Sequence, residues 1–120
     1  MRSSGVVMPK YVTLASWSGA SWARMISDPD DRLAAAQELA DALGANLEAY
    51  YWMPFATRDV LIMFDAPDHL TAAALNMTVE STGAVKDTET YELLTQEQFG
   101  QALTMAADGV QVYRPPGQLE

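Results

Sequence analysis

The side chains best suited to chemistry lie between Glu48 and Asp59, in the stretch EAYYWMPFATRD. Carboxyl groups buried beside apolar side chains can serve as general acids or bases, so Asp59 and Glu48 are the catalytic candidates. Arg58 can bind a substrate carboxylate through two parallel hydrogen bonds. A simpler interpretation makes Asp59 a turn or strand-edge residue and leaves Arg58 solvated. Both interpretations stay open at the level of sequence.

The aromatic and apolar residues of the same region also allow two interpretations. Rings with a polar handle, such as those of Tyr50 and Trp52, suit the wall of a pocket for a flat or apolar small molecule. The same side chains equally suit an ordinary core together with a subunit interface. The predicted ligand-binding residues are Trp17, Tyr50, Trp52, Phe55, Arg58, Leu61 and Met63.

Several classes of site are disfavoured by what the sequence lacks. It contains no cysteine, which excludes disulfides, thiolate metal sites and cysteine nucleophiles. The single histidine, His69, falls in the first turn of a predicted helix, where a surface role is favoured over catalysis or zinc binding. No glycine-rich phosphate loop, Gly-x-Ser-x-Gly motif or spaced acidic loop occurs. We therefore predict neither a cofactor nor a metal ion.

The charge of the chain argues against two classes of partner. Asp and Glu number 16 against 7 Lys and Arg, a net charge of −9, so phosphate backbones and anionic membranes are repelled. The longest central apolar run, VLIMF, is far too short to span a bilayer. The first ten residues lack the apolar region of a secretory signal. We expect a cytoplasmic protein that binds neither nucleic acid nor membrane.

The hydrophobic periodicity predicts an alternation of strands and helices. A strand over Lys10–Trp17 precedes a short helix capped by Ser18, and a long helix capped by Ser27 or Asp28 follows. The remaining predicted elements are strands near 45–53 and 58–64, a helix over 67–81, a strand over 85–94 and a helix opened by a Thr-x-x-Gln capping box at Thr95. The order βαββαβ plus a C-terminal helix is the ferredoxin-like pattern, an α+β fold with a four-stranded antiparallel sheet.

The length of 120 residues corresponds to a single domain. We predict a flexible N-terminal segment over 1–9, the domain over 10–108 and a C-terminal tail over 109–120. In the helix over 67–81, we expect one face to point toward the sheet. That predicted inward face consists of Leu70, Ala73, Ala74 and Met77.

Alternation along the strands predicts which face of the sheet each side chain occupies. Strict alternation places Tyr51 and Met53 under the helices, and Tyr50 and Trp52 on the face that no helix covers. The latter face would also carry Leu61 and Met63. Because a large exposed apolar patch is unusual, we expect a second subunit to cover this face, sheet against sheet, in a homodimer.

The chain resembles the GYD-domain family, a small ferredoxin-like family in the dimeric α+β barrel group. The resembling segments are YVTLASW, SDPDDRLAAAQELADALGANLEAYYW, RDVLIMFDAPD, TGAVKDTETYELLT and TQEQF. The family's Gly-Tyr-Asp signature, just before the third strand, is represented here by Thr57, Arg58 and Asp59, of which Asp59 alone matches. The resemblance implies the fold and dimerisation more than a particular chemistry.

Three hypotheses about function remain open. The first is a homodimeric protein that binds a small apolar or aromatic ligand in a cavity by the sheet. The second is a cofactor-free enzyme of the monooxygenase, isomerase or cyclase type acting in that cavity, which fold analogy alone suggests. The third is a purely structural or interaction dimer without a ligand.

Overall fold

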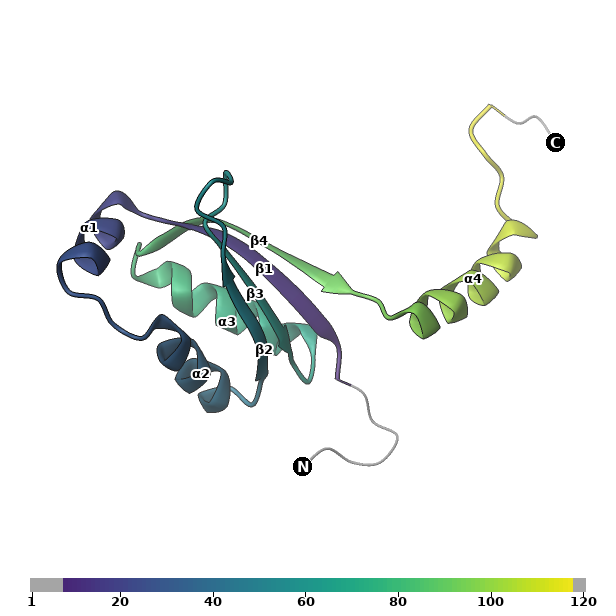
Figure 1. Ribbon diagram of the computed structural model, residues 1–120. Coiled ribbons are helices and arrows are strands. Elements are labelled where there is room, and N and C mark those ends of the chain that lie inside the picture. Colours follow the sequence, from purple (N-terminus) through teal and green to yellow (C-terminus); the bar gives the residue numbers. More distant parts are fainter. Residues whose placement is uncertain (1–7, 118–120) are drawn as a thin grey trace.

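The computed structural model describes residues 8–117 (Figure 1). The elements, in chain order, are β1 (Lys10–Trp17), α1 (Gly19–Ser27), α2 (Arg32–Ala42), β2 (Asn46–Trp52), β3 (Val60–Asp65), α3 (His69–Ser81), β4 (Val85–Leu93) and α4 (Gln96–Val110). Residues 1–7 and 118–120 lie outside the described residues. The expectations for the N-terminal segment and for the last part of the tail fall largely there.

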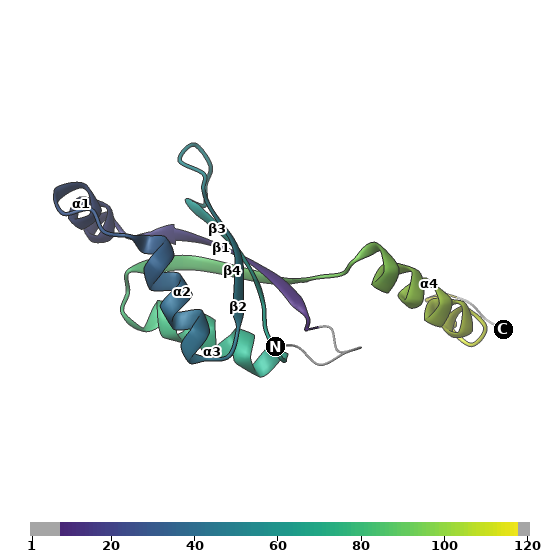
Figure 2. The same ribbon diagram turned by 60° about the horizontal axis from the view of Figure 1, so that its bottom comes forward.

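The four strands form one sheet in the order β2-β3-β1-β4, and each neighbouring pair is antiparallel. Helices α2 and α3 lie on the same face of this sheet, which we call the helix face (Figure 2). This arrangement confirms the predicted α+β, ferredoxin-like fold. It leaves the opposite face, which we call the bare face, without a covering helix in the described part of the chain.

The core lies between the sheet and the two helices of the helix face. Tyr11 of β1 stacks on Phe64 of β3, with ring centroids 5.4 Å apart and an interplanar angle of 18°. Ala40 of α2 and Ala72 and Leu75 of α3 are buried against them. Small alanines allow both helices to approach the sheet closely, so a chain of this length can close a compact core.

Helix starts follow the predicted capping chemistry at most positions. The side chain of Ser18 accepts a hydrogen bond from the Ser21 N–H, and Thr95 and Gln98 form the complete capping box of α4. Helix α2 is the exception, because its N-cap is Asp31, whose carboxylate accepts from the Ala34 N–H. The predicted start at Ser27 or Asp28 is therefore wrong. Ser27 instead closes α1, and Asp28 caps the end of that helix.

The inward face of α3 differs from the predicted one. Ala72 and Leu75 are its buried residues, whereas Leu70 and Met77 are 71% and 69% exposed. The helix is rich in alanine, so two apolar stripes were available and periodicity alone did not distinguish them. Packing against the sheet selects the stripe with Ala72 and Leu75.

The predicted faces of the aromatic run are also wrong, because β2 contains a β-bulge. Leu47 lies opposite Phe64 and Ala49 lies opposite Met63, so Glu48 is one extra residue in β2. An extra residue reverses the alternation of every side chain that follows it. The helix face consequently carries Tyr50 and Trp52, which lie opposite Ile62 and Val60, and the bare face carries Tyr51, which lies opposite Leu61.

Helix α4 stands apart from the rest of the described chain. It continues beyond the end of β4, and both views show it clear of the sheet and of α2 and α3 (Figures 1 and 2). None of its residues is buried. The radius of gyration is 18.7 Å, whereas a compact domain of this length has about 14 Å. The C-terminal helix therefore completes no part of its own chain's core.

Within the described residues, no helix combines the length and apolar character needed to cross a membrane.

Candidate functional site

The three tryptophans of the chain meet at one end of the sheet. Trp17 and Trp52 stack with ring centroids 6.1 Å apart and an interplanar angle of 22°. The ring centroid of Trp22 lies 6.1 Å from that of Trp52. The ring centroid of Tyr50, two residues before Trp52 on β2, lies 5.8 Å from that of Trp52. Arg32 completes the group, with its guanidinium carbon 5.2 Å from the centre of the Trp17 ring. We call these five residues the tryptophan corner.

Local structure explains how distant parts of the sequence reach this corner. Trp17 ends β1, and the Ser18 cap turns the chain into α1, which carries Trp22 in its first turns. The β2 bulge turns Tyr50 and Trp52 to the helix face, beside the end of β1. Arg32 is the first residue of α2, where the Asp31 cap places it over the sheet end. The corner thus depends on two caps and one bulge.

Two N–H groups at the corner are buried without an acceptor among the described residues. They are Nε1 of Trp17 and Nε of Arg32. Another guanidinium nitrogen of Arg32, Nη1, pairs with Asp30 at 2.9 Å. Burial raises the pKa of the Tyr50 phenol, while the nearby Arg32 charge opposes that shift. An enclosed donor without a partner costs about 1–3 kcal/mol, so these groups favour an incoming acceptor.

Two hollows adjoin the corner. One, of about 410 Å³, lies along α1 and the turn after α3, and its lining includes Trp17, Arg24 and Arg32. The other, of about 290 Å³, includes Trp22, Arg32 and Trp52 in its lining. The two linings share Met25, Asp30 and Arg32. The side chain of Arg32 therefore forms part of the wall between two spaces of small-molecule size.

Asp59, a predicted catalytic residue, forms hydrogen bonds with two residues of the tryptophan corner. Its Oδ2 accepts a hydrogen bond from the backbone N–H of Trp17 at 2.9 Å and one from Nε1 of Trp22 at 3.4 Å. Its own N–H donates to the carbonyl of Ala15, and its carbonyl accepts from the Met53 N–H. Asp59 thereby ties β1, α1 and the β2–β3 loop together. These contacts indicate a positioning role.

Arg58 lies at the edge of the bare face and not at the corner. Its guanidinium pairs with Glu89, and its Nε donates to the carbonyl of Asp87 at 2.8 Å. Asp87 has a positive φ of 54° in an irregular part of β4. Tyr91 donates to Glu89, and this hydrogen bond raises the pKa of the Tyr91 phenol. Arg58 is thus engaged by β4.

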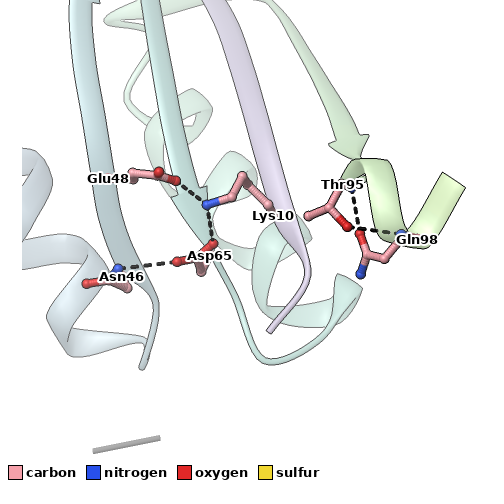
Figure 3. Close-up of polar contacts among 6 residues, drawn as sticks. All are labelled: Lys10, Asn46, Glu48, Asp65, Thr95 and Gln98. Carbon is pink, nitrogen blue, oxygen red and sulfur yellow. Dashed lines mark hydrogen bonds and ion pairs between the residues drawn. The ribbon is translucent and has the colours of Figure 1, made fainter. Parts of the chain in front are cut away.

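Glu48 lies at the opposite end of the sheet, in a polar cluster with Lys10, Asp65 and Asn46 (Figure 3). Lys10 pairs with Glu48 and, at 2.9 Å, with the buried carboxylate of Asp65. Asn46 donates to the other oxygen of Asp65 at 3.3 Å. The hydrogen bonds from Lys10 to Glu48 and then to Asp65 raise the pKa of Lys10. Thr95 and Gln98 of the α4 capping box line a shared cleft of about 320 Å³ with this cluster (Figure 3).

The predicted site residues accordingly separate into four places. Trp17, Tyr50 and Trp52 meet at the corner with Asp59 beside them. Leu61, Met63 and Arg58 belong to the bare face, and Glu48 belongs to the far polar cluster. Phe55 is fully exposed in the β2–β3 loop. Since Glu48 and Asp59 lie near opposite ends of β1, about 23 Å apart at 3.3 Å per residue, they do not form a catalytic pair.

Sequence reasoning missed two residues of the corner, Trp22 and Arg32. Trp22 had one available signal: it follows a strand that ends in Trp17 and a Ser18 cap, so the first helical turn brings the two tryptophans near the same sheet end. Arg32 had none, because its position over Trp17 follows from how α2 packs. Among the described residues, no three His, Asp or Glu side chains gather as metal ligands.

Comparison with known proteins supports one assignment. No curated protein and no solved structure matches the chain. The GYD domain family model matches residues 11–103, which include the four strands, apart from Lys10, and the first half of α4. The matched region spans well over half of the chain, and the protein therefore belongs to the GYD-domain family.

Proposed function

We propose that the protein binds a small planar aromatic acid at the tryptophan corner. The observation that carries the proposal is the position of Arg32, which stacks on Trp17, lines both hollows and has a buried Nε without an acceptor among the described residues. Aromatic walls hold a flat ring, and a guanidinium recognises a carboxylate. The sequence alone predicts an apolar or aromatic ligand on the bare face. The proposal adds an acidic group to that ligand and puts the site on the helix face, where Tyr50, Trp52 and Arg32 lie.

The chemistry of recognition divides between rings and charge. Trp52 is 42% exposed, so its ring remains available to stack on a ligand while Trp17 supports it from behind. The ligand carboxylate takes the place of the Asp30 carboxylate on Arg32, which frees Asp30 to return to water. Arg24 lines the 410 Å³ hollow as a second cation, and Asp28 and Asp30 lie in the same lining. The guanidinium of Arg32, which lines both hollows, is therefore the group that the proposal assigns to the ligand's carboxylate.

Binding is favoured here over catalysis. Asp59 is engaged by the Trp17 and Trp22 N–H groups, and Glu48 is engaged by Lys10 at the other end of the sheet. A group occupied in this way is a poor general base until its partner leaves. The enzyme alternative would therefore need a different acid or base at the corner.

We also propose that the protein acts as a homodimer through the bare face. The pairing of the strands puts seven apolar or aromatic residues on that face: Val12, Leu14, Ala49, Tyr51, Leu61, Met63 and Tyr91. Tyr51 and Tyr91 are 64% and 51% exposed. Contiguous apolar surface of this kind supports an interaction site.

Isothermal titration calorimetry with 2-naphthoate tests the ligand proposal, with the neutral analogue 2-naphthalenemethanol as a probe of ring binding alone. Wild type should bind the acid more tightly than the alcohol. Arg32→Gln should lower affinity for 2-naphthoate about tenfold, equivalent to about 1.4 kcal/mol, and should leave the alcohol unaffected. Arg114→Gln, in the exposed C-terminal segment, is the matched control. Equal acid binding by wild type and Arg32→Gln, or no binding by wild type, would overturn the proposal.

A further inference from the structure

Helix α4 carries one continuous apolar stripe that nothing in the described chain covers. Phe99, Leu103, Ala106 and Val110 follow one another at spacings of four, three and four residues, which places them on one side of a helix. Phe99, Leu103 and Val110 are 49%, 56% and 73% exposed. The polar residues Glu97, Gln101 and Asp108 lie on the opposite side. This pattern is typical of a helix that packs against another surface.

The rest of its own chain does not provide that surface. Only Leu94 and Thr95 separate β4 from α4, and the capping box between Thr95 and Gln98 holds the first turn (Figure 3). The helix leaves in the direction away from the sheet (Figures 1 and 2). The helix face is already occupied by α2 and α3. An isolated helix of this length is marginal in water, so its stability requires a partner.

We infer that α4 is a dimerisation arm, whose apolar stripe packs on a second copy of this chain. The inference rests on the homodimer of the proposed function and extends its interface beyond the bare face. Two-fold symmetry makes the contact reciprocal, so each copy covers the arm of the other and no stripe is left exposed. A second copy can cover the bare face and the α4 stripe at the same time.

The area of the surfaces supports this occupant. A four-stranded sheet with strands of about 20 Å has a footprint of about 380 Å². Helix α4 adds about 220 Å², from a length of about 22 Å and a width of about 10 Å. These are planar footprints, and the accessible surface of the protruding side chains is larger. The bare face and the arm together therefore offer an area of the order of the about 800 Å² of accessible surface that each partner buries in a standard dimer.

The distribution of charge leaves the uncovered surfaces open to a second copy. The chain has a net charge of −9, which repels another copy over most of its surface. The stripe of α4 is uncharged, and so is the centre of the bare face around Leu14, Leu61 and Met63. Charged groups lie at the two rims of that face, in the Lys10–Glu48–Asp65 cluster and the Arg58–Glu89 pair. A second copy can therefore approach the α4 stripe and the centre of the bare face without strong repulsion.

Sedimentation velocity over a range of concentrations tests the inference on the full chain. Wild type should sediment as a dimer, and Leu103→Asp should weaken dimerisation at least about tenfold by removing the centre of the stripe. Gln101→Asp introduces the same residue on the opposite side of α4 and should leave the dimer unchanged. Circular dichroism checks that each variant retains the sheet, to whose core α4 contributes no buried residue.

Met63→Asp, on the bare face, separates the two proposals. If Met63→Asp dissociates the dimer while Leu103→Asp sediments like wild type, the sheet-face dimer stands and the arm inference is wrong. A monomeric wild type overturns both. Hydrogen exchange then distinguishes packing of α4 on a second copy from packing of α4 on its own chain. Protection of the α4 amides should disappear on dilution. Protection that does not depend on protein concentration would overturn the inference.

Discussion

The indole ring of Trp52 stacks on the indole ring of Trp17, with centroids 6.1 Å apart, although 34 positions separate the two residues in the chain. The contact joins the last residue of β2 to the last residue of β1 across β3. It forms because the extra residue Glu48 in β2 turns Trp52 to the helix face. Without the bulge, Trp52 would occupy the bare face and the tryptophan corner would not exist.

Trp52→Ala should remove most binding of a planar acid and only part of the stability. The substitution deletes a ring that is 42% exposed and in contact with Trp17, Trp22 and Tyr50. We expect affinity for 2-naphthoate to fall at least about tenfold. The free energy of unfolding should fall by about 1–2 kcal/mol, since aromatic pairs contribute about 0.5–1.5 kcal/mol beyond area burial.

Calorimetry and urea unfolding measure these two effects of Trp52→Ala separately. Tyr113→Ala is the matched control, because Tyr113 is an aromatic residue 67% exposed beyond α4. Undiminished affinity in Trp52→Ala, with the fold intact, would place the ligand site elsewhere.

Asp59→Ala should destabilise the protein and disturb the tryptophans together. It removes the acceptor of the Trp17 backbone N–H and of Trp22 Nε1. Hydrogen bonds to charged groups contribute about 1.5–3 kcal/mol, so the free energy of unfolding should fall by about 2 kcal/mol. The tryptophan emission maximum should move to longer wavelength as Trp22 becomes more solvated. Asp108→Ala on exposed α4 should change neither quantity, and an unshifted emission in Asp59→Ala would contradict the positioning role.

The Lys10 cluster should make stability depend on alkaline pH. Hydrogen bonds to Glu48 and Asp65 raise the pKa of Lys10 above its usual 10.5 in the folded protein. A raised pKa stabilises the fold fully below 10.5, and this contribution is lost as pH rises through the folded value. Lys10→Met lacks that contribution and leaves the buried Asp65 carboxylate with Asn46 alone. At neutral pH we expect it to cost about 1–2 kcal/mol, because solvent screens the partly exposed pair.

Urea unfolding at about pH 9 and about pH 11.5 measures the effect. The stability difference between wild type and Lys10→Met should shrink at the higher pH. Burial raises the pKa of Tyr11, so Tyr11 also lowers stability above pH 10, equally in both proteins. The difference between the two proteins therefore isolates Lys10. A difference that stays constant with pH would show that Lys10 does not act through its charge.

Much of the fold was predictable because its signals are local. Ser18 and Thr95 cap helices by hydrogen bonds within a few residues, and Gly44 and Gly83 end α2 and α3 with the positive φ of 76° that glycine tolerates. The β1 strand begins and ends where its composition predicts. The order of these elements was enough to predict the ferredoxin-like sheet, and the family match confirms the assignment.

The candidate site was only half predictable. Trp17, Tyr50 and Trp52 were expected to line one pocket, and the structure does bring them together, but on the opposite face from the one expected. Leu61 and Met63 consequently leave the group. A residue type can suggest that a ring lines a pocket, but the pocket's position depends on strand register.

By itself, the sequence determined the caps of α1 and α4, the element order, the fold class and the presence of surplus aromatic surface, because each rests on neighbours a few residues apart. Only the tertiary structure decided the face of Tyr50 and Trp52, the inward stripe of α3 and the stacking of Arg32 on Trp17. Each of these depends on a partner far along the chain. One bulged residue reverses a strand's alternation, and an alanine-rich helix presents two stripes of nearly equal hydrophobicity until the sheet selects one.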